Sequence, residues 1–142
     1  MKKTILYSAL SLAFFSVSYV SAQDSPCTTE DNGDGCGGCS ITVFDAHESL
    51  HCYYRGVATH KRIDDCFENR LGLLQAGVGA GDSCKDYQLD NNIFSARCRN
   101  GDGNYVYTSR DIRRYFVGRG SDWLQLRIGG GPAVGTGIFC AQ

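Results

Sequence analysis

Two stretches of this chain repeat the same arrangement of cysteine, isoleucine and phenylalanine, and this repetition limits the folds that the chain can adopt. One stretch runs from Cys39 to Phe67 and the other from Cys84 to Phe116. Their paired cysteines, Cys39 with Cys52 and Cys84 with Cys98, lie thirteen and fourteen positions apart. Each stretch ends with an isoleucine and a phenylalanine four positions apart. We interpret the two stretches as an internal duplication.

The residues inside each copy predict β-strands. Apolar residues alternate with polar ones at Ile41 and Val43, and again at Tyr87 and Leu89, as in a half-buried strand. The closing Ile–Phe pair places two apolar side chains on one face of a helical turn. We therefore expect an all-β fold built from two tandem repeats with short helical turns.

Turn segments separate the expected strands. They lie at Asp45–Ser49, at Asp90–Asn92 and at Asn100–Gly103, where Asp, Asn and Gly tolerate the backbone conformations of tight turns. We expect a strand at 105–108 and a return strand that contains Trp123, Leu124, Leu126 and Ile128. The Gly-rich segment 76–81 is a flexible joint between the repeats and could act as a hinge for domain swapping.

The first 22 residues have the features of a secretory signal peptide. Two lysines precede an apolar run from Ile5 to Phe15, which is too short to span a membrane, and Val20 and Ala22 provide the small residues of a cleavage site. Removing 1–22 leaves 12 basic and 15 acidic side chains, a net charge of −3 (14 − 2 basic against 15 acidic). This balance argues against nucleic acid or an anionic membrane as the main partner. We expect a secreted, extracellular protein that does not span a membrane.

The chain contains eight cysteines, all after residue 22, and an even number in a short secreted chain predicts four disulfides. Eight cysteines allow 105 pairings. The duplication indicates Cys39–Cys52 and Cys84–Cys98, each closing a loop worth roughly 3 kcal/mol. For the other four cysteines we expect Cys36–Cys66 and Cys27–Cys140.

The two ends of the mature chain look different from the repeats. Residues 23–38 are polar and Gly-rich, lack apolar periodicity and predict an irregular arm. The segment 31–35 lacks the spacing and the closing Glu of a calcium loop. Cys36 and Cys39 have C-x-x-C spacing without the βαβ context of a redox site. In the Gly-rich extension 129–142, Ile138–Cys140 predicts an edge strand.

A literal HExxH motif occurs at His47–His51. On a helix its two histidines would hold zinc and Glu48 would serve as base. Here the motif lies between two cysteines in an expected hairpin, where four residues span roughly 13 Å, too far for one ion. His60 does not stand at the position that the extended motif requires for a third ligand. The only methionine is Met1, so the Met-turn of the metzincins is missing. We expect surface histidines, no enzymatic activity, no metal and no cofactor.

The repeated residues carry a family resemblance. The second copy contributes Ser83, Cys84, Leu89, Phe94, Ala96, Cys98, Asn100, Gly101, Ser109, Ile112 and Phe116. The first copy contributes Cys39, Leu50, Cys52, Ile63, Phe67, Glu68, Asn69, Gly72 and Leu74. Over residues 37–128 this pattern resembles the cyanovirin-N homology family. The resemblance implies two pseudo-symmetric repeats, about 39–80 and 81–128, each with a triple-stranded sheet and a β-hairpin, in a monomer or a domain-swapped dimer.

Members of that family are lectins for high-mannose glycans, and the resemblance implies where sugar would bind. Matched residue by residue, one site comprises Glu68, Asn69, Asp82, Ser83, Arg99, Asn100 and Asp102. Carboxylates, amides and a guanidinium offer the donors and acceptors that sugar hydroxyls need. The opposite site would comprise Tyr53, Tyr54 and Arg55 with residues 118–121.

Two functions therefore follow from the sequence. The first is a secreted, non-enzymatic lectin for mannose-type glycans or glycoproteins. The alternative is a secreted cysteine-rich effector or toxin-like interaction protein on the same scaffold without sugar binding, since fold alone does not fix function.

Overall fold

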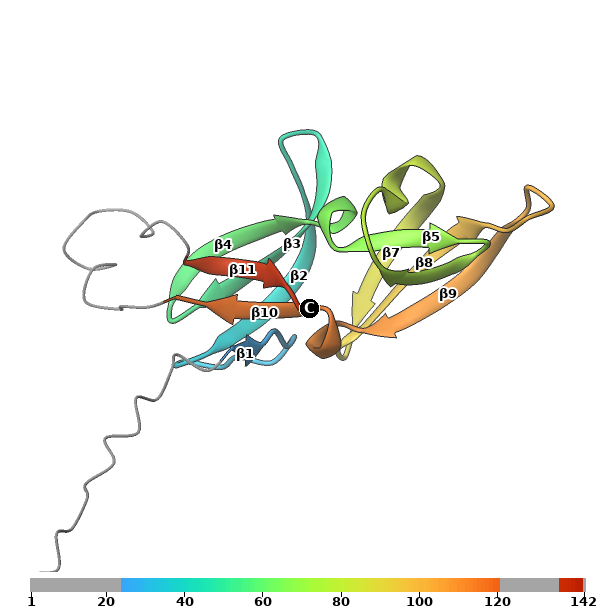
Figure 1. Cartoon of the computed structure of the whole chain (residues 1–142). Coiled ribbons are helices and arrows are strands. Elements are labelled where there is room, and N and C mark those ends of the chain that lie inside the picture. Colours follow the sequence, from blue (N-terminus) through green and yellow to red (C-terminus); the bar gives the residue numbers. More distant parts are fainter. Residues whose placement is uncertain (1–23, 121–135, 142) are drawn as a thin grey trace, which may run out of the picture.

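The computed structural model describes residues 24–120 and 136–141, which form an all-β protein with only short 3₁₀ turns. Figure 1 shows two lobes, one around the strands β2, β3 and β4 and the other around β7, β8 and β9. Among the described residues, no helix is long and apolar enough to cross a membrane.

The first lobe contains an antiparallel sheet in the order β2 (Cys36–Phe44), β3 (His47–Tyr54) and β4 (Val57–Arg62). On β3 the alternation of side chains turns Leu50, Cys52 and Tyr54 into the core. The turn before β3 consists of Asp45 and Ala46, both with positive φ. It is shorter than the predicted turn 45–49, because the residues from His47 onward already pair with β2.

The second lobe contains the equivalent sheet β7 (Cys84–Asp90), β8 (Ile93–Arg99) and β9 (Tyr105–Asp111). Asn91 and Asn92 form the predicted turn with φ of 46° and 68°. Strand β9 continues three residues beyond the predicted 105–108 and pairs with β8 along its whole length.

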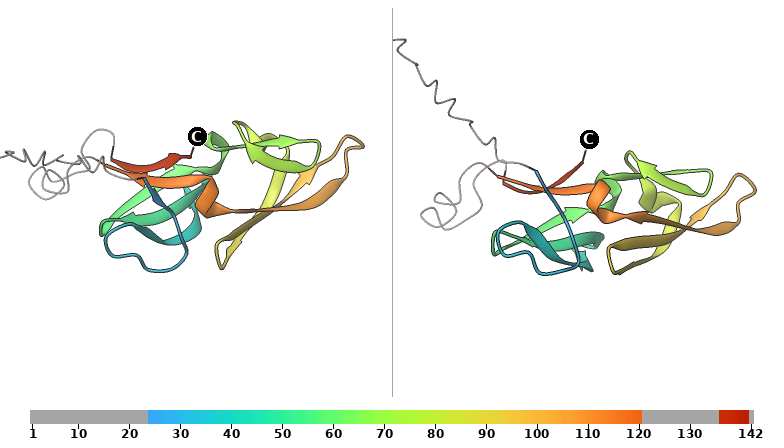
Figure 2. Two further views of the ribbon diagram at one scale, coloured as in Figure 1. Left: turned by 60° about the horizontal axis from the view of Figure 1, so that its bottom comes forward. Right: turned by 90° about the horizontal axis from the view of Figure 1, so that it is seen from below.

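A 3₁₀ turn and a hairpin follow each sheet. In the first half η1 (Ile63–Asp65) leads to the pair β5 (Phe67–Arg70) and β6 (Leu73–Ala76), and η2 (Ala80–Asp82) precedes β7. In the second half η3 (Ile112–Arg114) leads to β10 (Phe116–Arg119), which pairs with β11 (Gly137–Cys140). The views in Figures 1 and 2 place β5 beside β7–β9, and β10 and β11 beside β2–β4. Each half therefore contributes its hairpin to the other lobe.

Two threonines attach the exchanged hairpins in the same way. The N–H of Leu74 on β6 donates to Thr108 Oγ1 on β9 at 3.2 Å. The N–H of Ile138 on β11 donates to Thr59 Oγ1 on β4 at 3.3 Å. Thr59 lies four positions before Ile63 of η1, and Thr108 lies four positions before Ile112 of η3. The same hydroxyl at the same place in both halves supports the inferred duplication.

Aromatic side chains form the junction between the lobes. Phe67 is fully buried, and its ring centroid lies 5.1 Å from that of Phe94, 4.7 Å from that of Tyr115 and 5.7 Å from that of Phe116. The two phenylalanines that end the repeats, Phe67 and Phe116, are thus in contact. Burial of large aromatic side chains makes this junction a major source of stability.

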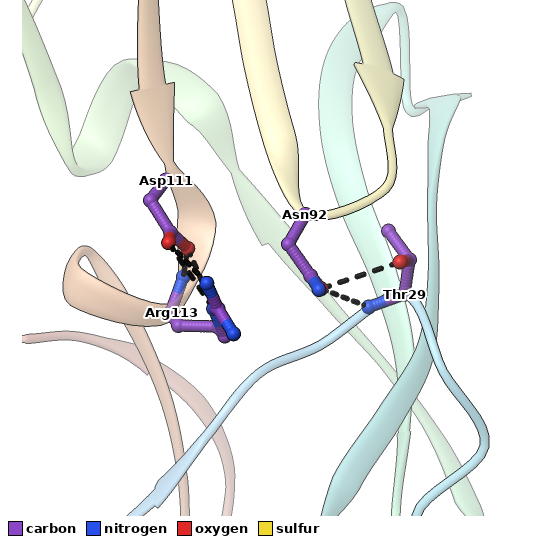
Figure 3. A network of polar contacts seen from close by, with 4 residues as sticks. All are labelled: Thr29, Asn92, Asp111 and Arg113. Atoms are coloured by element: carbon purple, nitrogen blue, oxygen red, sulfur yellow. Dashed lines mark hydrogen bonds and ion pairs between the residues drawn. The ribbon is translucent and has the colours of Figure 1, made fainter.

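The N-terminal arm is more ordered than the sequence indicated. Residues Ser25–Pro26 form β1, which pairs with β10, and β2 begins at Cys36 instead of Cys39. Further along, Asn92 Oδ1 accepts hydrogen bonds from the N–H of Thr29 at 2.7 Å and from its hydroxyl at 3.2 Å (Figure 3). The arm therefore connects β10 of one lobe to the β7–β8 turn of the other.

Four disulfides link the eight cysteines. The pairs expected from the duplication, Cys39–Cys52 and Cys84–Cys98, are formed. The other two predicted pairs are wrong, because the bonds are Cys27–Cys36 and Cys66–Cys140. The strand β1 and the following turn bring Cys27 against β2, and the exchanged hairpin brings Cys140 to η1, where Cys66 lies.

The predicted edge strand at Ile138–Cys140 is present as β11. The predicted return strand at 123–128 lies outside the described residues.

The disulfides should differ in their contribution to stability. Cys66–Cys140 closes a loop with a separation of 74 residues, whereas Cys27–Cys36 closes one of 9. Because the loss of unfolded-state entropy grows with loop length, we expect Cys66→Ala/Cys140→Ala to lower the free energy of unfolding by about 2 kcal/mol more than Cys27→Ala/Cys36→Ala. Urea unfolding of the two double variants measures the difference, and equal losses would contradict it.

Candidate functional site

Asn69 links three of the segments that were predicted to form the carbohydrate site. Its Nδ2 group donates to Ser83 Oγ and to the carbonyl oxygen of Arg99, both at 2.9 Å. Its Oδ1 accepts from the N–H of Gly72 at 2.8 Å. Both amide hydrogens are therefore used inside the protein, and the side chain fixes the β5–β6 hairpin against the cysteine end of β7–β8.

The loop after Cys98 is held by a second amide. Asn100 Oδ1 accepts from the N–H groups of Asp102 at 3.0 Å and Asn104 at 3.1 Å. The N–H of Arg99 donates to the carbonyl oxygen of Ser83 at 2.9 Å. These bonds form a tight turn whose tip, including Asp102, is exposed.

The charged residues of the predicted site have more hydrogen-bonding groups free for a ligand than Asn69 has. Asp82 and Asp102 are exposed, and no described residue forms an ion pair with either carboxylate. The Nε of Arg99 donates to Tyr105 Oη at 3.1 Å, which leaves the terminal nitrogens of its guanidinium available. Glu68 accepts a hydrogen bond from the side-chain amide of Gln75.

The structure thus brings together four of the seven predicted residues: Asn69, Ser83, Arg99 and Asn100, whose Cβ lies against Gly72. Glu68 lies on the same hairpin strand as Asn69, and Asp82 precedes Ser83, whereas Asp102 sits at the tip of its own turn. No contact joins Glu68, Asp82 and Asp102 to one another. The site is a rigid frame of amides with charged groups around it.

Two exposed leucines beside this frame were not assigned a role from the sequence. Leu71 at the β5–β6 turn is 75% exposed and Leu73 on β6 is 57% exposed. Leu71 has a positive φ of 52°, which is unusual for this residue type. The only signal in the sequence was the apolar pair around Gly72 at a turn.

The opposite predicted site is altered by the arm. Tyr53 is 49% exposed, whereas Tyr54 is only 2% exposed and packs in the core, so the two rings do not share one surface. A Cβ on Gly118 would overlap the Tyr54 ring, and β1 pairs with β10 at this residue. The arm and the core therefore cover the backbone around Gly118, where a sugar would have to approach. Residue 121, which was also predicted for this site, lies outside the described residues.

The HExxH residues lie on a strand. His47–His51 belongs to β3, so the shared helical face of a zinc protease is absent. His51 Nδ1 instead lies 3.0 Å from His60 Nε2, directly across the sheet, and Arg62 contacts His47. Within the described residues, the cluster that meets metal-ligand distances is made of Cys27, Cys36, Cys39 and Cys52, whose sulfurs are all in disulfides.

An acidic concavity between the lobes was also missed. It has a volume of about 400 Å³, and Glu48, Asp64 and Asp86 line it together with His47, Lys85 and Tyr87. Partial burial, together with the charges of Asp64 and Asp86, raises the pKa of Glu48. Burial likewise raises the pKa of Tyr87, whose hydroxyl is buried without a hydrogen-bond partner among the described residues. Sequence could not reveal this concavity, because the three carboxylates come from separate elements.

We expect Asn69→Ala to destabilise the fold, because it removes three hydrogen bonds and leaves the N–H of Gly72 without its acceptor. A loss of about 2 kcal/mol in the free energy of unfolding is expected. Asn104→Ala is the matched control, since only the backbone of Asn104 is hydrogen-bonded. Similar stabilities of the two variants in urea unfolding would show that Asn69 does not hold the frame.

The raised pKa of Glu48 predicts a pH-dependent effect of its replacement. The folded protein keeps the Glu48 proton to higher pH than the unfolded chain, so stability falls as pH rises through the folded pKa. We expect Glu48→Gln to stabilise the protein near neutral pH and to have no effect at about pH 3, where the carboxyl is protonated in both states. The effect should be small, because the side chain is exposed. Thermal unfolding at both pH values, with Glu30→Gln as control, measures it; stabilisation only at low pH would refute the assignment.

No protein-family model matches this chain, and no curated protein matches it significantly.

Proposed function

We propose that this protein is a secreted, non-enzymatic carbohydrate-binding protein that recognises mannose-type glycans, on a scaffold similar to that of the cyanovirin-N homology family. The observation that carries the proposal is the frame around Asn69. This frame joins the β5–β6 hairpin, Ser83 and the Arg99–Asn100 turn into one polar surface. A rigid polar surface binds a ligand without the entropic cost of ordering its own loops.

The groups left available on this surface suit sugar hydroxyls. The carboxylate of Asp82 accepts hydrogen bonds, the terminal nitrogens of Arg99 donate them, and the hydroxyl of Ser83 can still donate. Charge-assisted hydrogen bonds of this kind are stronger than neutral ones. The neighbouring exposed Leu71 offers an apolar contact for a sugar ring.

A second candidate is a secreted cysteine-rich effector or toxin-like interaction protein that has kept the scaffold without binding sugar. The specific observation in its favour is that Asn69 uses both amide hydrogens internally. The covering of the opposite predicted site by β1 leaves one site per chain. A single weak site gains no avidity unless the protein dimerises.

Titration of the mature protein with a high-mannose oligosaccharide tests the first candidate. We expect Glu68→Gln/Asp82→Asn to weaken binding by about tenfold or more, because a hydrogen bond to a charged group contributes about 1.5 kcal/mol or more. The measurement is calorimetric titration at constant ionic strength.

Asp31→Asn/Asp45→Asn is the matched control, because it removes the same two charges at exposed positions in other turns. Its affinity should equal that of the parent protein. Absence of binding to any mannose glycan, or equal affinity of the two double variants, would favour the interaction protein.

A further inference from the structure

The outer face of the sheet β7–β8–β9 carries cations and tyrosines in register. Arg97 on β8 lies opposite Lys85 on β7 and opposite Tyr107 on β9, and Arg99 lies opposite Tyr105. The intervening residues of β8 point inward and are buried, so this set points to solvent. We call the following residues the cationic face: Lys85, Arg97, Arg99, Tyr105 and Tyr107.

Contacts across the strands hold the upper part of this face. The Nζ of Lys85 lies 4.0 Å from the centroid of the Tyr105 ring, and the guanidinium carbon of Arg99 lies 5.4 Å from the same centroid. Arg99 also donates to the hydroxyl of Tyr105. Tyr107 remains 69% exposed next to Arg97, so its ring is open to a ligand.

The other end of the sheet is hollow. A concavity of about 430 Å³ lies between Ile93, Ser109 and Tyr115, with Arg110 and Arg114 in its lining. Its one carboxylate, that of Asp111, is held by Arg113, with Nη2 at 2.6 Å and Nε at 2.9 Å (Figure 3). Hydrogen bonds from Arg113, together with the charges of Arg113 and Arg114, lower the pKa of Asp111. Asp111 therefore offsets part of the positive charge at this end of the sheet.

The two ends form one strip. Ser95 and Ser109 face each other between them; Ser95 is buried, so it offers little surface to a ligand. From the Ile93–Asp111 pair to the Arg99–Tyr105 pair, the strip spans six residues of strand, roughly 20 Å.

The three cations of the face, Lys85, Arg97 and Arg99, form no ion pair with a described residue. Ion pairs among the described residues join Lys61 to Asp65, Arg113 to Asp111 and Arg119 to Asp24, and none involves the face. Asp86 lines the concavity between the lobes together with Lys85, and Asp90 lies opposite Ile93 at the other end of the sheet. Three positive charges without an ion pair on one face of a chain with a net charge of −1 indicate complementarity to an anion.

We propose that the cationic face binds a linear polysaccharide that carries sulfate or carboxylate groups. Guanidinium groups bind such anions through paired hydrogen bonds, and the open ring of Tyr107 can pack on the apolar face of a sugar. Single-stranded nucleic acid is a poorer fit, because successive bases need several open rings, and the ring of Tyr105 is already covered by Lys85. This inference goes beyond the proposed function and shares only Arg99 with the mannose site.

Calorimetric titration with a size-defined heparin oligosaccharide and with an unsulfated polyuronate tests the proposal. We expect Lys85→Gln/Arg97→Gln to weaken binding about tenfold and to reduce its dependence on salt concentration, because fewer counterions are released. Tyr107→Ala should weaken binding several-fold with the salt dependence unchanged, since it removes no charge.

Arg62→Gln/Arg70→Gln removes two exposed charges elsewhere and should change affinity less than twofold. Binding of either polyanion with these effects supports the proposal. The proposal would be overturned by equal losses of affinity in both double variants, or by binding of neither polyanion. It would also be overturned if an oligonucleotide of equal charge bound as tightly and its affinity were unchanged by Tyr107→Ala. Titration of the same variants with the high-mannose oligosaccharide separates the two proposals, because neither Lys85 nor Arg97 belongs to the mannose site.

Discussion

The contact of Phe67 with Phe94, Tyr115 and Phe116 is the interaction on which the arrangement of the two lobes depends. Phe67 and Phe116 end the two repeats, so the point where each half stops is also the point where the halves meet. Their burial requires each hairpin to continue away from its own sheet and onto the other lobe. The matched hydroxyls of Thr59 and Thr108 then attach these hairpins. A duplicated unit that could not bury its own apolar face is completed by its copy.

The exchange of hairpins also creates the polar frame. The residues around Asn69 lie on β5, whereas Ser83 and Arg99 belong to the sheet on which that hairpin packs. A change in the aromatic junction would therefore move the frame as well as the core. Cys66–Cys140 has the corresponding role in the first lobe, since it joins η1 to the exchanged strand β11.

Much of this fold was predictable from the repeats, because spacing and alternation are local. The pairs Cys39–Cys52 and Cys84–Cys98 followed from the spacing of cysteines within each copy. Cys66–Cys140 did not, because it depends on which lobe receives β11. Within the site, Asn69 was named through the family resemblance, as part of the Glu68–Asn69 pair. The sequence could not indicate that both amide hydrogens would be used internally, because that depends on Ser83 and Arg99 in space. The alternating arginines Arg97 and Arg99 and tyrosines Tyr105 and Tyr107 can be read in the sequence. The negative net charge of the chain nevertheless gave no indication that they form a local cationic surface.

The outer faces of the two sheets show how one scaffold can acquire two surface chemistries. Aligning Cys52 with Cys98 places His51 at the position of Arg97, with buried serines, Ser49 and Ser95, two residues before each. Partial burial and the neighbouring His51 lower the pKa of His60, so His60 gains its charge only as pH falls below the usual range of histidine. The arginines of the second face stay charged at every pH at which the protein is folded. The duplicated backbone thus presents the pair His51–His60 on one lobe, where Arg62 is the permanent charge, and Arg97 beside Lys85 at the corresponding place on the other.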